Sequence, residues 1–403
     1  MLRLIISVLL LGLFSGCDLI DSGPKKNPEP RISHLDIEAS ELLSVAGNLI
    51  PIEISVTGKL DNGEQAQIGT SYTLYSNGEV VSTPKKFSSE VPGYYRIHAE
   101  YEGISSDTLL IEVRRQQKLT EVEFNIIFHI VHDGEEIGDG YNVSQDVIDN
   151  QLNKLRQVFS NESLSYTPNS TPAAMSFKLA TVNPKGEELE EPGINRIQRP
   201  GTEYSILFED WMWDHYWDPD FYINVWIGDT KNGYSWGIYP RLSCDSNLGG
   251  LECTDDETPL SIEGIALELD NLWEGNWVFP HEVGHYFGLF HVFGPTACDS
   301  DTDFASDTKV YDREVYESGS QSTNRTSCSG QNFVSYNVMD YWNQPKGGRD
   351  ITHDQVVRIR YVIERGRFRA SQDPETGQPR TMTPPKEKTE KVLPKFHHNK
   401  IAQ

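Results

Sequence analysis

The chain has 403 residues, which is enough for about two folded domains with additional tails. Its hydrophobic content of 37% and aromatic content of 10% support buried cores, which excludes a chain that is disordered throughout. The formal net charge of -25 argues against binding to nucleic acid, because proteins that bind nucleic acid present basic surfaces.

Residues 1–17 are predicted to be a signal peptide that is not part of the fold. Arg3 precedes an apolar stretch, 4–14, that is too short to cross a bilayer. The stretch ends in Phe-Ser-Gly-Cys and resembles a bacterial lipobox, in which the cysteine, here Cys17, carries the lipid and becomes the mature N-terminus. Phe14 stands where such boxes usually carry Leu, and the alternative is an ordinary secretory signal with an incidental cysteine.

Residues 18–31 are polar and are expected to tether the first domain to the lipid. The predicted location is that of an exported bacterial lipoprotein on the outer membrane or the cell surface. The alternative is the periplasmic face of the membrane. The membrane is therefore an expected partner, through the N-terminal lipid.

The other cysteines form an even set in an exported chain, which predicts two disulfides with three conceivable pairings. Proximity along the chain favours Cys244–Cys253 and Cys298–Cys328. Metal binding by these cysteines is disfavoured, because the sequence contains no Cys-x-x-Cys pair.

Residues 32–115 are predicted to form an all-β domain. Apolar and polar residues alternate in 52–56, 95–101 and 109–113, and turn sequences such as Asp61-Asn62-Gly63 separate these runs. Short alternating strands at this spacing indicate a small β-sandwich. The segment 92–113 resembles the closing hairpin of a bacterial immunoglobulin-like domain, which implies a spacer role.

Residues 119–364 have the mixed pattern of an α+β domain. The predicted strands are 122–130, 175–180 and 222–227, and a helix is expected after Ser144. Thr352 and Gln355 form a capping-box pattern before a final helix. The aromatic and acidic run 209–220 either lines a substrate cleft or packs against the domain. Residues 365–403 are rich in Pro, Lys and Gln and are predicted to be disordered.

The strongest motif is His281-Glu282-x-x-His285-x-x-Gly288-x-x-His291. Two histidines four residues apart lie on one face of a helix, so both imidazoles reach one zinc ion. Gly288 allows the sharp turn that brings the third histidine to the metal from outside the helix. Three imidazoles leave a fourth position open, which is the pattern of a catalytic zinc site. With 32 Gly and 11 His in 403 residues, this extension reduces chance matches roughly five-hundredfold.

At these residues the sequence resembles the metzincin metalloproteases, whose second signature is a Met-turn. The segment 337–341 reads Asn-Val-Met-Asp-Tyr and supplies Met339 downstream of the histidines. Within that clan the pappalysin family is the nearest likeness. The positions that match its spaced cysteines and acidic stretch are Cys298, Asp303, Asp307, Thr308 and Cys328.

This resemblance implies a zinc metalloendopeptidase that hydrolyses protein or peptide substrates. His281, His285 and His291 are the expected zinc ligands, Glu282 the general base acting on zinc-activated water, and Tyr341 a hydrogen-bond donor to the oxyanion. Met339 is expected to form an apolar floor under the zinc. The acidic stretch with Asp303, Asp307 and Thr308 is a candidate calcium site.

Two features depart from the family pattern. Pro280 directly precedes His281, so the zinc helix either starts near this proline or is kinked there. Asn343-Gln344-Pro345 stand where the family carries Asp and Cys.

Two other functions remain as alternatives. One is a surface adhesin or binding lipoprotein with an inert protease fold. The other is a zinc amidase or esterase.

Overall fold

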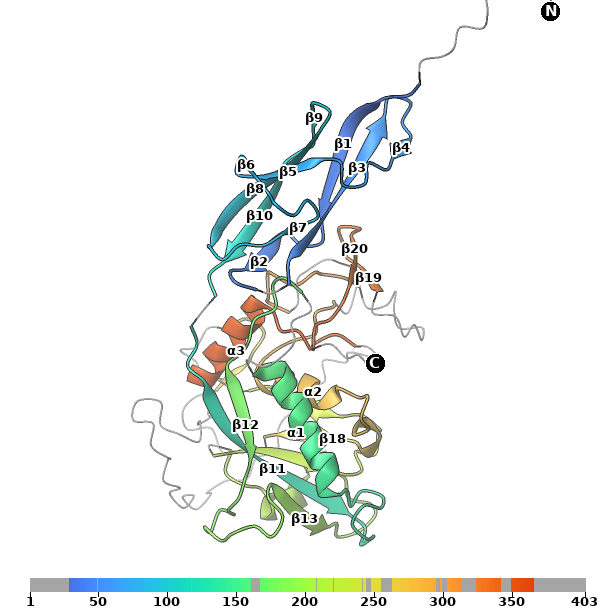
Figure 1. Cartoon of the computed structure of the whole chain (residues 1–403). Coiled ribbons are helices and arrows are strands. Elements are labelled where there is room, and N and C mark those ends of the chain that lie inside the picture. Colours follow the sequence, from blue (N-terminus) through green and yellow to red (C-terminus); the bar gives the residue numbers. More distant parts are fainter. Residues whose placement is uncertain are drawn as a thin grey trace, which may run out of the picture.

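The computed structural model describes residues 29–365 with several gaps (Figure 1). The gaps are 49, 117, 161–166, 208, 220, 241, 244–247, 255–262, 295–297, 299–302, 313–323 and 342–348. The predicted signal peptide lies outside the described residues, and so do the predicted tether up to residue 28 and the predicted tail from residue 366. Arg365, predicted as the first residue of the tail, is instead the last residue of the final helix, because the helical pattern continues to it. No helix among the described residues is long and apolar enough to cross a membrane.

The N-terminal domain consists of two β-sheets that share one core (Figure 1). The first sheet contains β1 (Ile32–Ala39), β3 (Ile52–Leu60), β4 (Gln65–Ala66) and β7 (Lys86–Phe87). The second contains β2 (Leu43–Val45), β10 (Leu109–Arg114), β8 (Gly93–Tyr101), β5 (Thr73–Ser76), β6 (Glu79–Val80) and β9 (Ile104–Ser105). All pairs are antiparallel except β2 with β10, which are parallel.

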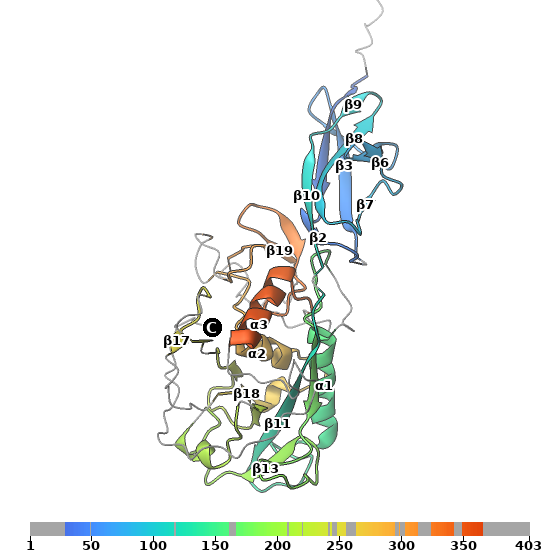
Figure 2. The same ribbon diagram turned by 90° about the vertical axis from the view of Figure 1, so that its left-hand side faces the viewer.

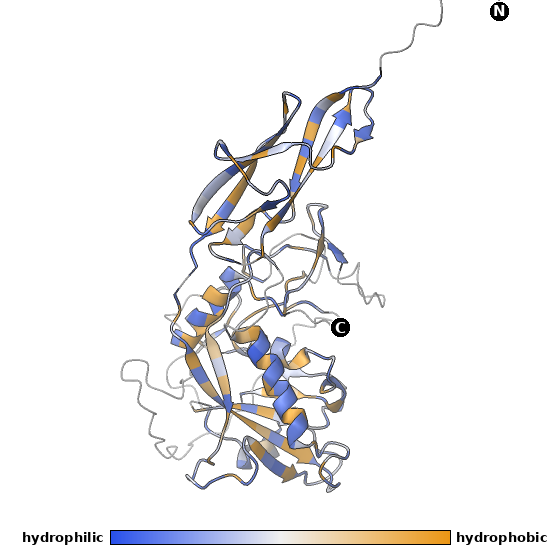
Figure 3. Ribbon diagram, in the orientation of Figure 1, coloured by the Kyte–Doolittle hydropathy of each residue, from blue (hydrophilic) through white to orange (hydrophobic). Residues whose placement is uncertain are grey.

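The alternation seen in the sequence produces this sandwich, because successive side chains of a strand point to opposite faces. Ile52, Ile54 and Val56 of β3 are buried, whereas Glu53 and Ser55 between them are exposed. Ile97 and Ile111 of the second sheet belong to the same buried cluster. Hydrophobic and hydrophilic bands alternate along these strands (Figure 3). The two-layer all-β region follows the sequence expectation, and its immunoglobulin-like character stays a prediction.

The second domain is built on a mostly parallel sheet around β11 (Val122–His132). The two short strands β12 (Met175–Leu179) and β13 (Ile194–Gln198) pair with β11, which also pairs with β14 (Tyr222–Ile227). Beyond β14 lie β18 (Ile265–Leu267) and then the antiparallel strand β15 (Trp236–Gly237) at the end of the strand order. The central strand is buried on both faces, as is usual for parallel sheets covered on both sides.

Three helices complete this domain: α1 (Gln145–Phe159), α2 (Val278–Tyr286) and α3 (His353–Arg365). The apolar stripe of α1 packs on the sheet through Ile148, Leu152 and Leu155 (Figure 3). The predicted capping box begins α3, since the Gln355 N–H donates to Thr352 Oγ1 and the Thr352 N–H donates to Gln355 Oε1. The remaining elements are η1 (Asp210–Asp214), η2 (Leu269–Asn271), β16 (Leu242–Ser243), β17 (Cys253–Thr254), β19 (Asn324–Thr326) and β20 (Asn332–Val334).

The aromatic run 209–220 packs against the sheet. Trp213, Tyr216 and Trp217 are buried, and Trp213 and Tyr216 share a cluster with Trp226 of β14. The sequence left open whether this run lines a substrate cleft or packs against the domain, and the structure supports packing for these three rings.

The two domains are in direct contact, with α3 close to the junction (Figures 1 and 2). Asn48 Nδ2 donates to the carbonyl oxygens of Pro168 and Ser170, both at 2.9 Å. Arg114, at the end of β10, donates to Asp354 Oδ1 at 2.5 Å. Each of these bonds joins the first domain to the second, so the N-terminal domain is docked onto the second domain by polar contacts.

Candidate metal centre

The helix that carries the zinc motif begins two residues before Pro280. Trp277 is its N-cap and Val278 its first residue, so Pro280 is the third residue of the helix. The first four N–H groups of a helix have no partner within it, and a proline in the first turn therefore removes no hydrogen bond. This position resolves the question that the sequence left open about the start of the helix.

The end of α2 is a tight turn formed by Gly288. The Gly288 N–H donates to the His285 carbonyl oxygen at 2.8 Å, and the Leu289 N–H donates to that of Gly284 at 2.9 Å. These two bonds define a Schellman motif, and Gly288 takes the left-handed conformation that it requires, with φ of +88°. The chain thereby reverses, so that His291 returns to the face of α2 that carries His281 and His285.

The three histidines meet through their Nε2 atoms. The Nε2 atom of His291 lies 3.1 Å from that of His281 and 3.0 Å from that of His285. The Nδ1 atom of His281 lies 2.8 Å from the Val338 carbonyl oxygen, and that of His285 lies 2.8 Å from the Leu289 carbonyl oxygen. Because a carbonyl oxygen only accepts, each Nδ1 must carry a proton, and each Nε2 of these two neutral rings carries a lone pair.

Burial keeps both helix histidines neutral. It lowers the pKa of His281 to about 4 and that of His285 to about 3. The Nε2 lone pairs of these two rings lie about 3 Å from the Nε2 atom of His291, a separation at which one cation can accept all three nitrogens as ligands. Three imidazoles, two of them neutral and oriented by backbone carbonyls, form the donor set of an open tetrahedral zinc site. The residues present therefore fit a zinc ion.

Glu282 is buried beside the histidines and follows His281 in the middle of α2. Burial raises the pKa of its carboxyl to about 8, and a backbone N–H of Gly237 counteracts part of this effect. Gly237 belongs to β15, and a Cβ atom at this position would lie 2.2 Å from the Glu282 carbonyl oxygen. Only a glycine lets the edge strand lie this close to the helix.

Met339 forms the floor under the helix, as the resemblance implied. Its side chain is fully buried, and a Cβ atom on Gly284 would lie only 2.4 Å from its Sδ atom. The residue before it, Val338, provides the carbonyl oxygen that orients His281. The turn is fixed from α3, because the Asn337 side chain bonds both the Met339 N–H and Gln355.

Two tyrosines reach the histidines. The Tyr341 ring centroid lies 4.5 Å from that of His291, and 41% of the residue is exposed. Tyr239 was not identified from the sequence, yet its hydroxyl lies 3.1 Å from Nδ1 of His285. It follows the edge strand β15, so only knowledge of the pairing between β15 and β18 would have placed it here.

The predicted calcium ligands are hydrogen-bonded within the chain. Asp303 accepts from the Ala305 N–H and from Thr308 Oγ1. Asp307 accepts from Thr352 Oγ1 and from the Asp354 N–H. Among the described residues, Asp307 lies close enough to His353 and Asp354 for the three to hold one metal ion. The Arg114 guanidinium lies beside this group. Asp303 and Thr308 do not belong to that group.

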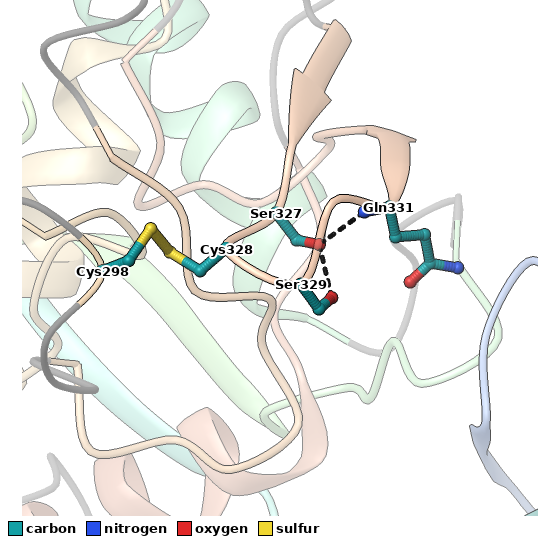
Figure 4. Close-up of a disulfide and its surroundings, with 5 residues drawn as sticks. All are labelled: Cys298, Ser327, Cys328, Ser329 and Gln331. Atoms are coloured by element: carbon teal, nitrogen blue, oxygen red, sulfur yellow. Dashed lines mark hydrogen bonds between the residues drawn. A yellow bond between two sulfur atoms is a disulfide. The ribbon is translucent and has the colours of Figure 1, made fainter.

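The Cys298–Cys328 pairing predicted from chain proximity is present in the structure, with a Cα–Cα distance of 5.5 Å (Figure 4). Beside it, Ser327 Oγ accepts from the Gln331 N–H at 3.1 Å and lies 2.8 Å from Ser329 Oγ (Figure 4). Cys244 and Cys17 lie outside the described residues. The Cys244–Cys253 pairing and the lipid attachment therefore stay predictions.

The sheet, the histidine-bearing helix and the methionine floor place the second domain in the metzincin-like class of peptidase domains. Residues 207–364 match the sequence model of the peptidase M43 family, described as Pregnancy-associated plasma protein-A. The matched region belongs to this family, the pappalysins, and the chain is a metalloprotease.

Several known proteins are similar to the chain. An extracellular metalloprotease of Neurospora crassa is 26% identical over 272 residues, which cover 66% of this chain and 84% of the relative. One from Sordaria macrospora is 25% identical over 272 residues, with the same coverage of 66% and 84%. Mature mirolysin of Tannerella forsythia, solved with a cleaved peptide, is 19% identical, with a TM-score of 0.46, over 64% of this chain and 94% of its own. A mutant of promirolysin from that organism is 20% identical, with a TM-score of 0.48, over 61% of this chain and 81% of its own.

Proposed function

We propose that the chain is a secreted zinc metalloendopeptidase that holds zinc through His281, His285 and His291. The main observation behind this proposal is that the Nε2 atoms of His281 and His285 both lie within 3.1 Å of the Nε2 atom of His291. The extracellular metalloproteases named above support the secreted location and the peptidase activity. The predicted signal peptide is consistent with export.

Zinc held by three imidazoles lowers the pKa of water and polarises a carbonyl group. Glu282 supplies the proton transfers, because the charge of a bound zinc ion would favour the carboxylate form of this buried group. The carboxylate takes the proton of the attacking water and delivers it to the amine that leaves. Tyr341, beside His291 and partly exposed, donates a hydrogen bond to the oxygen on which negative charge develops. The carbonyl oxygens of Val338 and Leu289 hold the two helix imidazoles in the tautomer that presents Nε2.

Strand β15 provides a binding surface for an extended peptide. It stands at the end of the sheet order and packs against α2, which bears Glu282. The backbone groups on the free side of an edge strand pair readily with an added strand. A peptide that pairs with β15 would pass along the helix that carries the base.

Peptide hydrolysis by the wild type, by Glu282→Gln and by the chelated enzyme tests the proposal. Hydrolysis of casein or of a peptide library should require zinc and should fall by at least about 10³-fold in Glu282→Gln. Equal hydrolysis in all three samples would show that another group does the chemistry. Hydrolysis of amide or ester model compounds without peptide cleavage would favour the zinc amidase or esterase. A chain that binds zinc and hydrolyses none of these substrates would favour the adhesin.

The lipid and the calcium ion are finer proposals with their own tests. Lipid at Cys17 predicts a lipid-modified N-terminal cysteine by mass spectrometry and partition into detergent, both lost in Cys17→Ser. Calcium at Asp303, Asp307 and Thr308 is supported by the acidic sequence of that stretch and by the family resemblance alone. It predicts a rise in melting temperature on adding calcium to the zinc-loaded protein.

A further inference from the structure

Arg358 of α3 is a buried arginine that lies against the metal centre and not at the surface. Only 3% of the residue is exposed. Its Nε donates to the Gly288 carbonyl oxygen at 2.5 Å, and its Nη2 donates to the Gly249 carbonyl oxygen at 2.7 Å. Gly288 is the residue at which the chain turns back toward His291.

The guanidinium also contacts two aromatic rings. Its centre lies 4.9 Å from the ring centroid of Phe290 and 5.3 Å from that of Phe304. Phe290 directly precedes His291 and also stacks on Tyr239, with centroids 4.8 Å apart. Arg358 therefore contacts both the turn before the third histidine and the residue next to it.

The glycines around this arginine leave little room for rearrangement. A Cβ atom on Gly288 would lie 2.9 Å from Val362 of α3. A Cβ atom on Gly250 would lie 2.5 Å from the Phe304 ring and 2.9 Å from the Phe290 ring. The turn, the loop at 249–250 and α3 are thus packed directly on one another.

A buried cation is costly unless dipoles or charges compensate it. The described residues place no carboxylate in ion-pair contact with Arg358, and burial lowers its pKa to about 10, so it stays charged at neutral pH. The direct contacts that compensate the charge are two carbonyl oxygens and two ring faces, one of these oxygens lying just beyond the C-terminal end of α2, and the more distant charge of Asp303 adds to them. An apolar residue could fill the same volume at lower cost, which argues that the hydrogen bonds to the backbone are what Arg358 contributes.

We propose that Arg358 is a positioning residue that holds the turn at Gly288 and thereby places His291 for zinc. This inference rests on the proposed zinc site. Changes to groups that orient metal ligands typically cost 10–100-fold in metal affinity. Arg358 acts one step further out, on the backbone that presents the ligand, so the lower end of that range is expected.

Zinc release to a chromogenic chelator, measured on the full mature chain, tests the proposal. Arg358→Met should release zinc at least about 10-fold faster than the wild type. Arg358→Lys keeps the charge but loses the fork of two donors, and it should fall between the two. The matched control is Arg360→Met, because Arg360 lies on the same helix but bonds Ala174, which precedes β12. It should release zinc within about twofold of the wild-type rate.

Melting temperatures with and without zinc separate positioning from a purely structural role. The rise in melting temperature on zinc binding should be smaller in Arg358→Met than in the wild type. A lower melting temperature with an unchanged zinc-dependent rise, or zinc release at the wild-type rate, would overturn the inference. If Arg358→Met does not fold, Arg358→Lys carries the same comparison. A wild-type chain that binds no zinc would instead refute the proposed function.

Discussion

Asp354 is a residue at which stability is expected to depend on pH. It is the second residue of α3, and its carboxylate accepts from Arg114 of the N-terminal domain and from the N–H and hydroxyl of Ser306. The hydrogen bond with His353, followed by those of Ser306 and the charge of Arg114, lowers the pKa of Asp354 from 3.8 to about 2. The side chain is 24% exposed, so solvent weakens these interactions only in part.

The lowered pKa converts into a stability that is present at neutral pH. A folded-state pKa near 2 against 3.8 in the unfolded chain corresponds to roughly 2 kcal/mol of unfolding free energy. Because the folded state holds the proton less tightly, this contribution is complete above about pH 5 and is lost as the pH falls toward 2. About half of it should remain at pH 3.

Asp354→Asn removes the charge at every pH, so its effect should shrink in acid. Urea unfolding monitored by circular dichroism should show a loss of about 2 kcal/mol at pH 7 and about half as much at pH 3. Asp139→Asn, at an exposed loop position, is the control and should change stability by less than about 0.5 kcal/mol. A loss in Asp354→Asn that is the same at both pH values would refute this account of the carboxylate.

Three further predictions concern the metal centre. Gly237→Ala forces the edge strand away from the Glu282 carbonyl oxygen. It should lower the unfolding free energy by about 1–3 kcal/mol and reduce peptidase activity. Unchanged urea unfolding would contradict the contact. In Gly288→Ala the alanine is strained by the left-handed φ of +88° and its Cβ atom clashes with Val362. This variant should bind zinc more weakly in a competition titration. Wild-type zinc affinity would refute the role of the turn. Tyr341→Phe should lower kcat by about 10²-fold with little change in KM, and an unchanged kcat would remove Tyr341 from the mechanism.

The sequence predicted what local patterns determine. The capping box of Thr352 and Gln355, the two strands 175–180 and 222–227 and the histidine spacing each depend on residues close in the chain, and the structure places them as expected, apart from shifts of a residue at strand ends. The methionine floor came from the family resemblance, because no spacing rule brings residue 339 under Gly284.

The features that the sequence did not reveal depend on contacts between distant segments. Tyr239 reaches His285 only because β15 pairs antiparallel with β18 and packs on α2. In the sequence, Arg358 cannot be told apart from an ordinary helix arginine. Its role depends on the contact with Gly288, 70 positions earlier. The sequence shows the carboxylates of Asp303 and Asp307 but not the threonine hydroxyls and backbone N–H groups that bond their oxygens. Calcium at this stretch stays a prediction.

The zinc content of the purified chain tests the central claim most directly. Elemental analysis should find about one zinc per chain in the wild type and in Glu282→Gln, and much less in His291→Ala after dialysis against a weak chelator. That pattern would show that the three histidines hold the metal and that Glu282 is not a ligand. Equal zinc in the wild type and His291→Ala, or its loss in Glu282→Gln, would contradict the account.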